Sequence, residues 1–224
     1  MNVIITLADK RHFHHAETIC NMMSEAALVR GTGIAKRQPE YIQKKMEEGK
    51  AILALDKDIP VGFCYIESWE NEKYVANSGL ITHVNYRNTG LAKAIKKATF
   101  DLSKQKYPNA KLFGITTSMA VMKINSNLGY KPVTFSELTQ DEKFWDGCNS
   151  CHNYDILQRT NKTMCICTGM VCDLKAIPAK GKVHHIGKTH TWNKFTKFLK
   201  LRKIRIQKKA KQFPKLNNFI NNEK

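Results

Sequence analysis

The stretch that decides the fold spans residues 83–92 and reads His-Val-Asn-Tyr-Arg-Asn-Thr-Gly-Leu-Ala. It follows an apolar strand that ends at Thr82 and precedes a segment with apolar residues at helical spacing, so it forms a loop that opens a helix. Unpaired amides and the positive end of the helix dipole attract phosphate at a helix N-terminus, and Gly90 lets a ligand approach the backbone without meeting a Cβ. The loop therefore predicts a pyrophosphate-binding site, with an ordinary strand-to-helix turn as the alternative.

The helix that follows this loop, over 91–106, is amphipathic. Its apolar residues recur on one face, at Leu91, Ile95, Ala98 and Leu102. The pattern assigns Lys96 and the other lysines of this helix to the remaining surface. We therefore expect the apolar face to pack on a sheet and the lysines to lie away from it.

Apolar patterns also predict the other elements of the chain. The predicted strands cover 3–7, 51–55, 61–68, 79–82, 111–116 and 170–174, and the remaining predicted helices cover 16–29, 39–48 and 119–128. A strand-rich first half followed by strand–helix–strand–helix units predicts an α/β fold, a mixed twisted sheet flanked by helices, with a cleft where parallel neighbours separate. We expect one domain over 1–174, with a cysteine-rich insertion at 145–172, and a basic, helical extension over 175–224.

Length and composition agree with one enzyme-sized domain. The chain has 224 residues, of which 42% are apolar, enough for one well-buried domain with an appendage. No run reaches the roughly 18 to 20 apolar residues of a membrane span, and the N-terminus lacks the features of a secretory signal. The expected location is the cytoplasm, where seven cysteines indicate thiols or metal ligands in place of disulfides.

The net charge of +18 is concentrated at the C-terminal end. Residues 180–224 contain fourteen lysines and arginines and one acid, so they carry +13 of the total and leave the remainder at +5. Interleaved aromatic and aliphatic residues predict an amphipathic helix there. This tail either binds nucleic acid or an anionic membrane, or docks its apolar face on the domain or on a second subunit of a homodimer.

A second motif makes the first one specific. Residues 128–132 read Leu-Gly-Tyr-Lys-Pro and follow one further strand and helix. Together, in order and separation, the two segments resemble motifs A and B of the GNAT acyl-CoA N-acyltransferases. The segment Leu28-Val29-Arg30, the strand at 112–117 and a late Tyr154…Gln158-Arg159…Lys162 look like the acetyltransferase domain of the N-acetylglutamate synthase family. The resemblance covers about residues 3 to 174 at the level of motifs.

The resemblance implies acetyl-CoA as co-substrate. It implies that Ile81 and Thr82 hydrogen-bond the pantetheine arm. The residues that it assigns to the pyrophosphate are Arg87, Asn88, Thr89, Gly90, Leu91 and Ala92. The alternative for Arg87 is a structural ion pair at the surface.

Acetyl transfer to an amine needs a base for the amine proton and an acid for the departing thiolate. Asn125 occupies the position of the tyrosine that protonates the thiolate in many members of the family, and an amide is no useful acid near neutral pH. Ser118 or a bound water are the alternatives. His83 is the candidate base, because histidine as a residue type titrates near physiological pH, and Glu67 and Glu70 could serve instead through water.

The acceptor implied by the resemblance is glutamate or a related amino acid, in arginine biosynthesis. Arg30, Arg159 and Lys162 would clamp its carboxylates, although each could equally be a surface cation. The segment from Tyr154 to Lys162 departs from the family pattern, so the alternative acceptor is another amine, such as a polyamine or a protein lysine. A nucleic-acid-binding module on a degenerate scaffold is the non-enzymatic alternative.

Four cysteines have spacing that could close a zinc site. They are Cys148, Cys151, Cys165 and Cys167, with His152 as an alternate ligand. A tetrahedral structural zinc there would brace a long loop. The alternative is a set of reduced thiols that pack as small apolar groups.

Overall fold

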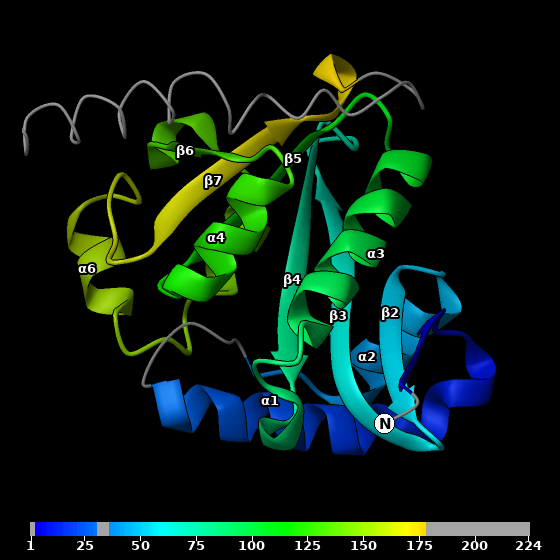
Figure 1. Cartoon of the computed structure of the whole chain (residues 1–224). Coiled ribbons are helices and arrows are strands. Elements are labelled where there is room, and N and C mark those ends of the chain that lie inside the picture. Colours follow the sequence, from blue (N-terminus) through cyan, green and yellow to red (C-terminus); the bar gives the residue numbers. More distant parts are fainter. Residues whose placement is uncertain (1–2, 31–35, 178–224) are drawn as a thin grey trace, which may run out of the picture. The chain divides into compact units, whose positions relative to one another are not determined.

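A computed structural model describes residues 3–30 and 36–177 and shows one mixed sheet with helices on both faces (Figure 1). The strand order is β1-β2-β3-β4-β5-β7-β6. The strands are β1 (Val3–Leu7), β2 (Ala51–Asp56), β3 (Ile59–Trp69), β4 (Tyr74–Thr82), β5 (Lys111–Thr116), β6 (Lys131–Val133) and β7 (Thr168–Asp173). The predicted α/β class with a mixed sheet is therefore confirmed.

Six α-helices and four short 3-10 helices accompany the described part of the sheet. The α-helices are α1 (Ala16–Arg30), α2 (Pro39–Glu47), α3 (Leu91–Lys106), α4 (Met119–Asn127), α5 (Glu142–Asp146) and α6 (Tyr154–Arg159). The 3-10 helices are η1 (Lys10–His15), η2 (Val84–Tyr86), η3 (Phe135–Glu137) and η4 (Leu174–Ala176). No helix among these described residues is long and apolar enough to cross a bilayer.

The sheet opens between its parallel strands. β4 and β5 form the one parallel pair among the described strands, and they pair only from Tyr74 opposite Lys111 to Ala76 opposite Phe113. Beyond Ala76, β4 continues to Thr82 and β5 to Thr116 without further pairing to each other. The two strands therefore separate over their C-terminal halves.

A β-bulge in β4 accompanies this separation. Phe63 of β3 lies opposite Ile81, whereas Tyr65 lies opposite Ser78, so β4 has one extra residue in this stretch. Gly79 adopts a left-handed conformation with φ +64°. A Cβ there would lie 2.5 Å from Cε1 of Tyr65, so glycine is required both for the backbone and for the packing. A bulge bends its strand and increases the twist, and this bend lies where β4 leaves β5.

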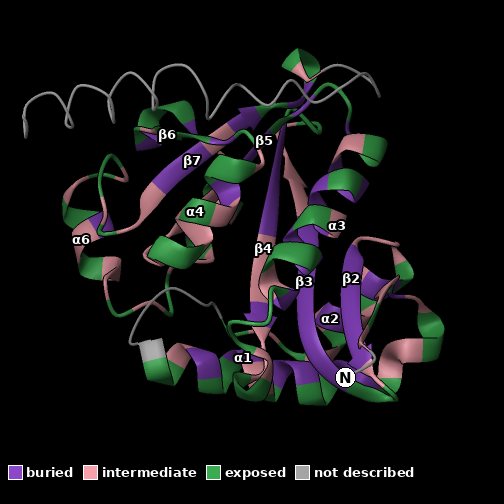
Figure 2. Cartoon of the chain, in the orientation of Figure 1, coloured by how far each residue is buried: buried purple, intermediate pink, exposed green. Residues whose placement is uncertain are grey.

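Helices cover both faces of the sheet. On one face, α3 packs on β2, β3 and β4 through Ile95 and Leu102. On the other face, α1 and α2 pack on β2 and β3 through Ile19 and Met46, and the segment 135–157 covers β4 and β5 beside them. Figure 2 shows buried residues along the central strands and exposed residues on the outer sides of the helices.

Most predicted elements lie where the sequence places them. The strands at 61–68 and 79–82 are longer in the structure, at Ile59–Trp69 and Tyr74–Thr82, and the short β6 was not predicted. One assignment is wrong: Lys96 is buried, with 2% of its surface exposed. The predicted basic helix after residue 178 lies outside the described residues.

Candidate active site

The loop before α3 contains two residues with positive φ and is held by two side-chain hydrogen bonds. Asn88 and Gly90 are both left-handed, with φ +62° and φ +90°, a backbone state that asparagine and glycine tolerate best. Tyr86 holds the loop against β2 by donating its hydroxyl to Asp56 at 2.6 Å, and Thr89 donates its own to the carbonyl of Tyr86 at 2.7 Å. The helix N-terminus at Leu91 is therefore presented by a braced loop.

A cavity of about 280 Å³ lies over this loop. Most of the residues predicted to bind the cofactor line it: Ile81, Thr82, Arg87, Asn88, Gly90, Leu91 and Ala92. Thr89 is not in the lining, because its hydroxyl turns back into the loop. A Cβ built on Gly90 would meet no atom within 4 Å, so the space above this residue is open to a ligand.

A second cavity, of about 390 Å³, occupies the opening between β4 and β5. It shares Leu80 and Val121 with the first cavity, so the two adjoin. Its lining includes Glu67 from the face covered by α1 and Lys96 from the face covered by α3. The cavity therefore crosses the sheet through the gap left by the separated strands.

Glu67 is the carboxylate in the wall of this second cavity. It lies on β3, its side chain is 15% exposed, and its Oε1 accepts a hydrogen bond from the hydroxyl of Tyr41 and lies 3.7 Å from Nζ of Lys45. Burial raises the pKa of Glu67, although the positive charge of Arg37 opposes the shift. A carboxylate with a raised pKa beside a substrate cavity is suited to accept a proton from an amine.

Lys96 approaches the cavity from α3. Its Nζ lies 5.3 Å from the ring centroid of Tyr130, and burial lowers its pKa to about 8. A thiol has an ordinary pKa of about 8.5, so the ammonium group of Lys96 is matched to protonate a thiolate. Sequence patterns missed this residue. The available signal was the stripe Ala92, Lys96, Thr99 and Ser103, whose small members leave room for one long side chain.

Asn125 is suited to ligand binding more than to proton transfer. It is 1% exposed, lines the second cavity from α4, and its Nδ2 lies 3.7 Å from Sδ of Met170. Its Oδ1 is one of two buried side-chain polar atoms in the described residues that have no hydrogen-bond partner. Because an amide oxygen only accepts hydrogen bonds, this atom is available to an N–H group of a bound molecule.

The other predicted catalytic residues lie apart from this cavity. His83 caps η2, where its Nδ1 accepts from the amide of Asn85 at 3.3 Å, and it lines neither cavity. Glu70 accepts from Thr139 and from the amide of Gln140. Ser118 lines the first cavity as the N-cap of α4. Of the three candidate bases, the structure therefore brings only Glu67 to the opening in the sheet.

The predicted acceptor-binding cations are not gathered at the cavity. Arg159 is 70% exposed and lies 3.9 Å from Asp155, and Lys162 pairs with Glu142. Neither lines either cavity, and the side chain of Arg30 lies outside the described residues. Arg37, which sequence patterns missed, does line the second cavity and donates to the hydroxyl of Tyr65 at 3.0 Å.

The four predicted zinc ligands, Cys148, Cys151, Cys165 and Cys167, form part of the wall of the second cavity. Burial raises the pKa of Cys148 to about 11 and that of Cys167 to about 12, so both are protonated thiols near neutral pH. Within the part of the chain that the structure describes, these cysteines do not form a group of three ligand atoms within 4.8 Å of one another. The geometry therefore gives no support to zinc binding here.

Comparison with solved structures shows that the chain has the fold of the GNAT acetyltransferases. N-acetylglutamate synthase from Neisseria gonorrhoeae, complexed with coenzyme A and N-acetyl-glutamate, matches with a TM-score of 0.57 and 13% identity over 78% of this chain. The chain spans 35% of the length of that synthase.

Two further similar structures are matched over nearly their full lengths. An acetyltransferase of the GNAT family from Staphylococcus aureus Mu50 has a TM-score of 0.53 and 14% identity, over 78% of this chain and 100% of its own. A Mycobacterium tuberculosis protein in complex with CoA has a TM-score of 0.53 and 11% identity, over 76% and 98%. No protein-family model and no curated protein matches the chain by sequence. At these sequence identities, the structural similarity establishes the fold but identifies neither the acceptor substrate nor a pathway.

Proposed function

We propose that the protein is an acetyl-CoA-dependent N-acetyltransferase. The observation that carries this proposal is the junction of two cavities, one over the helix N-terminus at Gly90 and one that crosses the sheet beside Glu67 and Lys96. The first suits the phosphates of a coenzyme, because amides and a helix dipole face it. The second suits a thioester at the end of a pantetheine arm, with an amine able to enter from the opposite face of the sheet.

Each protein group has a defined task in direct acyl transfer. Glu67 accepts a proton from the acceptor ammonium, directly or through one water, which frees the nitrogen lone pair. That nitrogen forms the new C–N bond to the thioester carbonyl carbon, the C–S bond breaks, and Lys96 donates its proton to the departing sulfur. The nitrogen loses its second proton to solvent water, which leaves a neutral amide. Asn125 Oδ1 accepts from an amide N–H of the pantetheine arm. Bound acetyl-CoA supplies the activated acyl group.

The charge of the second cavity favours an acceptor that carries a carboxylate. Three basic side chains and one acidic side chain line it: Arg37, Lys96, Lys143 and Glu67. A polycation such as a polyamine is repelled by this lining, whereas an amino acid brings a carboxylate that Arg37 can bind in a bidentate manner. We propose glutamate or a related amino acid as the acceptor, a choice also supported by the N-acetyl-glutamate in the similar synthase structure.

We expect Lys96→Met to lower kcat about a hundredfold, a typical loss for a general acid. Because Lys96 acts as a protonated donor and its pKa is about 8, the wild-type rate should fall as the pH rises through this value. The Lys96→Met variant should lose this decrease in rate on the alkaline side of the pH profile, the alkaline limb. Rates of thiol release between pH 6 and pH 10 measure both effects.

The fold should not suffer from this substitution, because methionine removes a buried charge and keeps a similar volume. Thermal unfolding without ligand and the shift caused by acetyl-CoA are the controls. A variant that is folded, binds acetyl-CoA and retains both wild-type kcat and the alkaline limb would show that Lys96 is not the acid.

Thiol release measured across acceptors tests the proposed function. We expect turnover with glutamate or a related amino acid, more with acetyl-CoA than with succinyl-CoA, and little with polyamines. Arg37→Ala should lower kcat/KM for the acceptor roughly ten- to a hundredfold, since a charge-assisted hydrogen bond contributes about 1.5 to 3 kcal/mol. Arg37→Lys should recover only part of the loss, because lysine lacks the planar fork.

Arg159→Ala is the matched control. It removes the same charge from an exposed position outside the cavity, so it should leave kcat/KM close to wild type. Equal losses in Arg37→Ala and Arg159→Ala would contradict the assignment of Arg37. If only polyamines were turned over, the proposal of an amino-acid acceptor would be wrong, but the proposal of acyl transfer would stand. If no amine caused thiol release, the proposal that the protein is an enzyme would be contradicted.

A further inference from the structure

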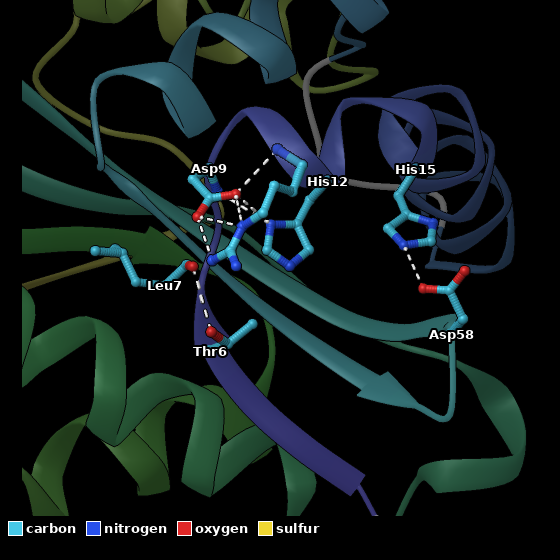
Figure 3. Close-up of polar contacts among 7 residues, drawn as sticks. Thr6, Leu7, Asp9, His12, His15 and Asp58 are labelled. Atoms are coloured by element: carbon cyan, nitrogen blue, oxygen red, sulfur yellow. Dashed lines mark hydrogen bonds and ion pairs between the residues drawn. The ribbon is translucent and has the colours of Figure 1, made fainter.

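A pair of adjacent histidines faces an aspartate at the opposite edge of the domain from β6. His14 and His15 end η1, and Asp58 lies in the tight turn between β2 and β3. Figure 3 shows His15 and Asp58 pointing toward each other. The helix η1 is fixed by Asp9, whose side chain accepts from the amide of Arg11 at 3.0 Å while its own amide donates to Nδ1 of His12 at 3.2 Å. This reciprocal cap orients η1, and with it the two histidines, toward the turn.

His15 has a ring nitrogen that is directed at Asp58 but makes no hydrogen bond. Its side chain is 6% exposed, and its Nε2 lies 3.4 Å from Oδ1 of Asp58. That nitrogen is the second of the two buried side-chain polar atoms in the described residues that make no hydrogen bond. A buried nitrogen without a hydrogen bond is unfavourable for stability, and a bound cation would satisfy it.

His14 completes the group from the solvent side. Its Nε2 lies 3.8 Å from Oδ2 of Asp58, and the ring centroids of His14 and His15 are 3.8 Å apart. One ligand atom from each of the three residues lies within 4.8 Å of the other two, the only such group of three or more among the described histidines, cysteines and carboxylates. Two imidazoles this close cannot both be charged without repulsion, whereas two neutral rings can point their lone pairs at one cation.

We propose that His14, His15 and Asp58 bind one divalent transition-metal ion of the zinc type. Two imidazole nitrogens and one carboxylate oxygen are ligands that Zn²⁺ accepts, whereas Mg²⁺ and Ca²⁺ prefer oxygen throughout. Asp58 is 84% exposed and His14 is 59% exposed, so water can fill the remaining coordination position. The ion joins η1 to the β2–β3 turn, two segments far apart in the sequence, and therefore stabilises the N-terminal edge of the sheet.

Zinc titration of the full chain under reducing conditions tests this site, with a chromogenic chelator as competitor. The wild-type protein should bind one more equivalent of Zn²⁺ than the Asp58→Asn and His14→Ala variants do. If a variant still binds that equivalent, its affinity should be at least tenfold lower than that of wild type. The thermal shift produced by Zn²⁺ should fall in the same variants. Both residues are exposed, so these substitutions preserve the fold, and His15→Ala adds the buried ligand to the series.

Matched variants separate this site from other ligands in the chain. Cys148→Ser and His152→Ala remove a thiol and an imidazole from the cysteine-rich segment and should retain the equivalent. Co²⁺ should bind with the weak visible absorption of nitrogen and oxygen ligands, without the intense near-ultraviolet band of thiolates. Zinc uptake that is unchanged in Asp58→Asn and His14→Ala, or absent in wild type, would overturn the proposal, as would loss of the equivalent in Cys148→Ser alone.

Discussion

A Gly90→Asp variant is expected to lose the thermal stabilisation that acetyl-CoA gives the wild-type protein. At a concentration about 100 times Kd, a ligand that binds only the folded state stabilises it by roughly 2.7 kcal/mol. Gly90 precedes the first residue of α3, and nothing lies within 4 Å of a Cβ built on it. An aspartate there would put bulk and negative charge into the space proposed for the phosphates. Differential scanning fluorimetry with and without acetyl-CoA measures the loss.

Gly90→Asn is the matched control for charge, because asparagine has nearly the same shape as aspartate and tolerates a positive φ. It should weaken the shift but not abolish it. Both variants share the strain of φ +90°, which costs about 1 to 3 kcal/mol in the unliganded protein, so comparison with each variant's own unliganded melting temperature is essential. A folded Gly90→Asp protein with a wild-type shift would place the coenzyme elsewhere.

Glu67→Gln should lower kcat/KM by roughly 100- to 10,000-fold, the range typical of a general base. Glutamine keeps the size of the side chain and can still contact Tyr41 and Lys45, but it cannot take the proton of the acceptor. Because burial raises the pKa of Glu67, the wild-type rate should fall as the pH drops through that raised pKa and the carboxylate becomes protonated. The variant should show no such acidic limb.

Glu70→Gln is the control for this prediction. Glu70 is three residues further along and accepts hydrogen bonds from Thr139 and from the amide of Gln140, so its replacement should affect stability and leave the pH profile unchanged. An acetyl-CoA thermal shift of wild-type size in Glu67→Gln would show that the cofactor site is intact. If His83→Gln removed the acidic limb and Glu67→Gln did not, the base would be His83.

Local patterns were enough to predict the elements on either side of the loop before α3, which is proposed to bind the coenzyme. The helix after Gly90 and the strand before it are specified by residues close in sequence, through periodic apolar positions and a glycine at a left-handed position. The cavity lining at Arg87, Asn88 and Gly90 therefore follows from the 83–92 stretch. Thr89 does not line the cavity, because whether its hydroxyl faces the ligand or the loop depends on a hydrogen bond that the pattern does not contain.

The chemistry of the second cavity depended on contacts between distant segments. Lys96 falls on the polar side of α3 by periodicity, yet the structure buries it against Tyr130, because strands β4 and β5 separate and leave space beneath the helix. Arg37 reaches the same cavity from the stretch before α2. Arg37 carries no signal in a sequence pattern, which reports only the faces of single elements, and the only signal for Lys96 was the small residues on its own face of α3.

The sequence by itself determined the α/β class, the loop before α3 and the order of most strands and helices, since each rests on interactions within a few residues. Only the tertiary structure showed that Glu67 lines the second cavity, whereas Glu70, His83, Arg159 and Lys162 do not. The physical reason is the bulge at Gly79 and the parting of β4 from β5. The opening in the sheet lies between strands that are distant in sequence, so a side chain reaches it only through its strand register and through the packing of the whole domain.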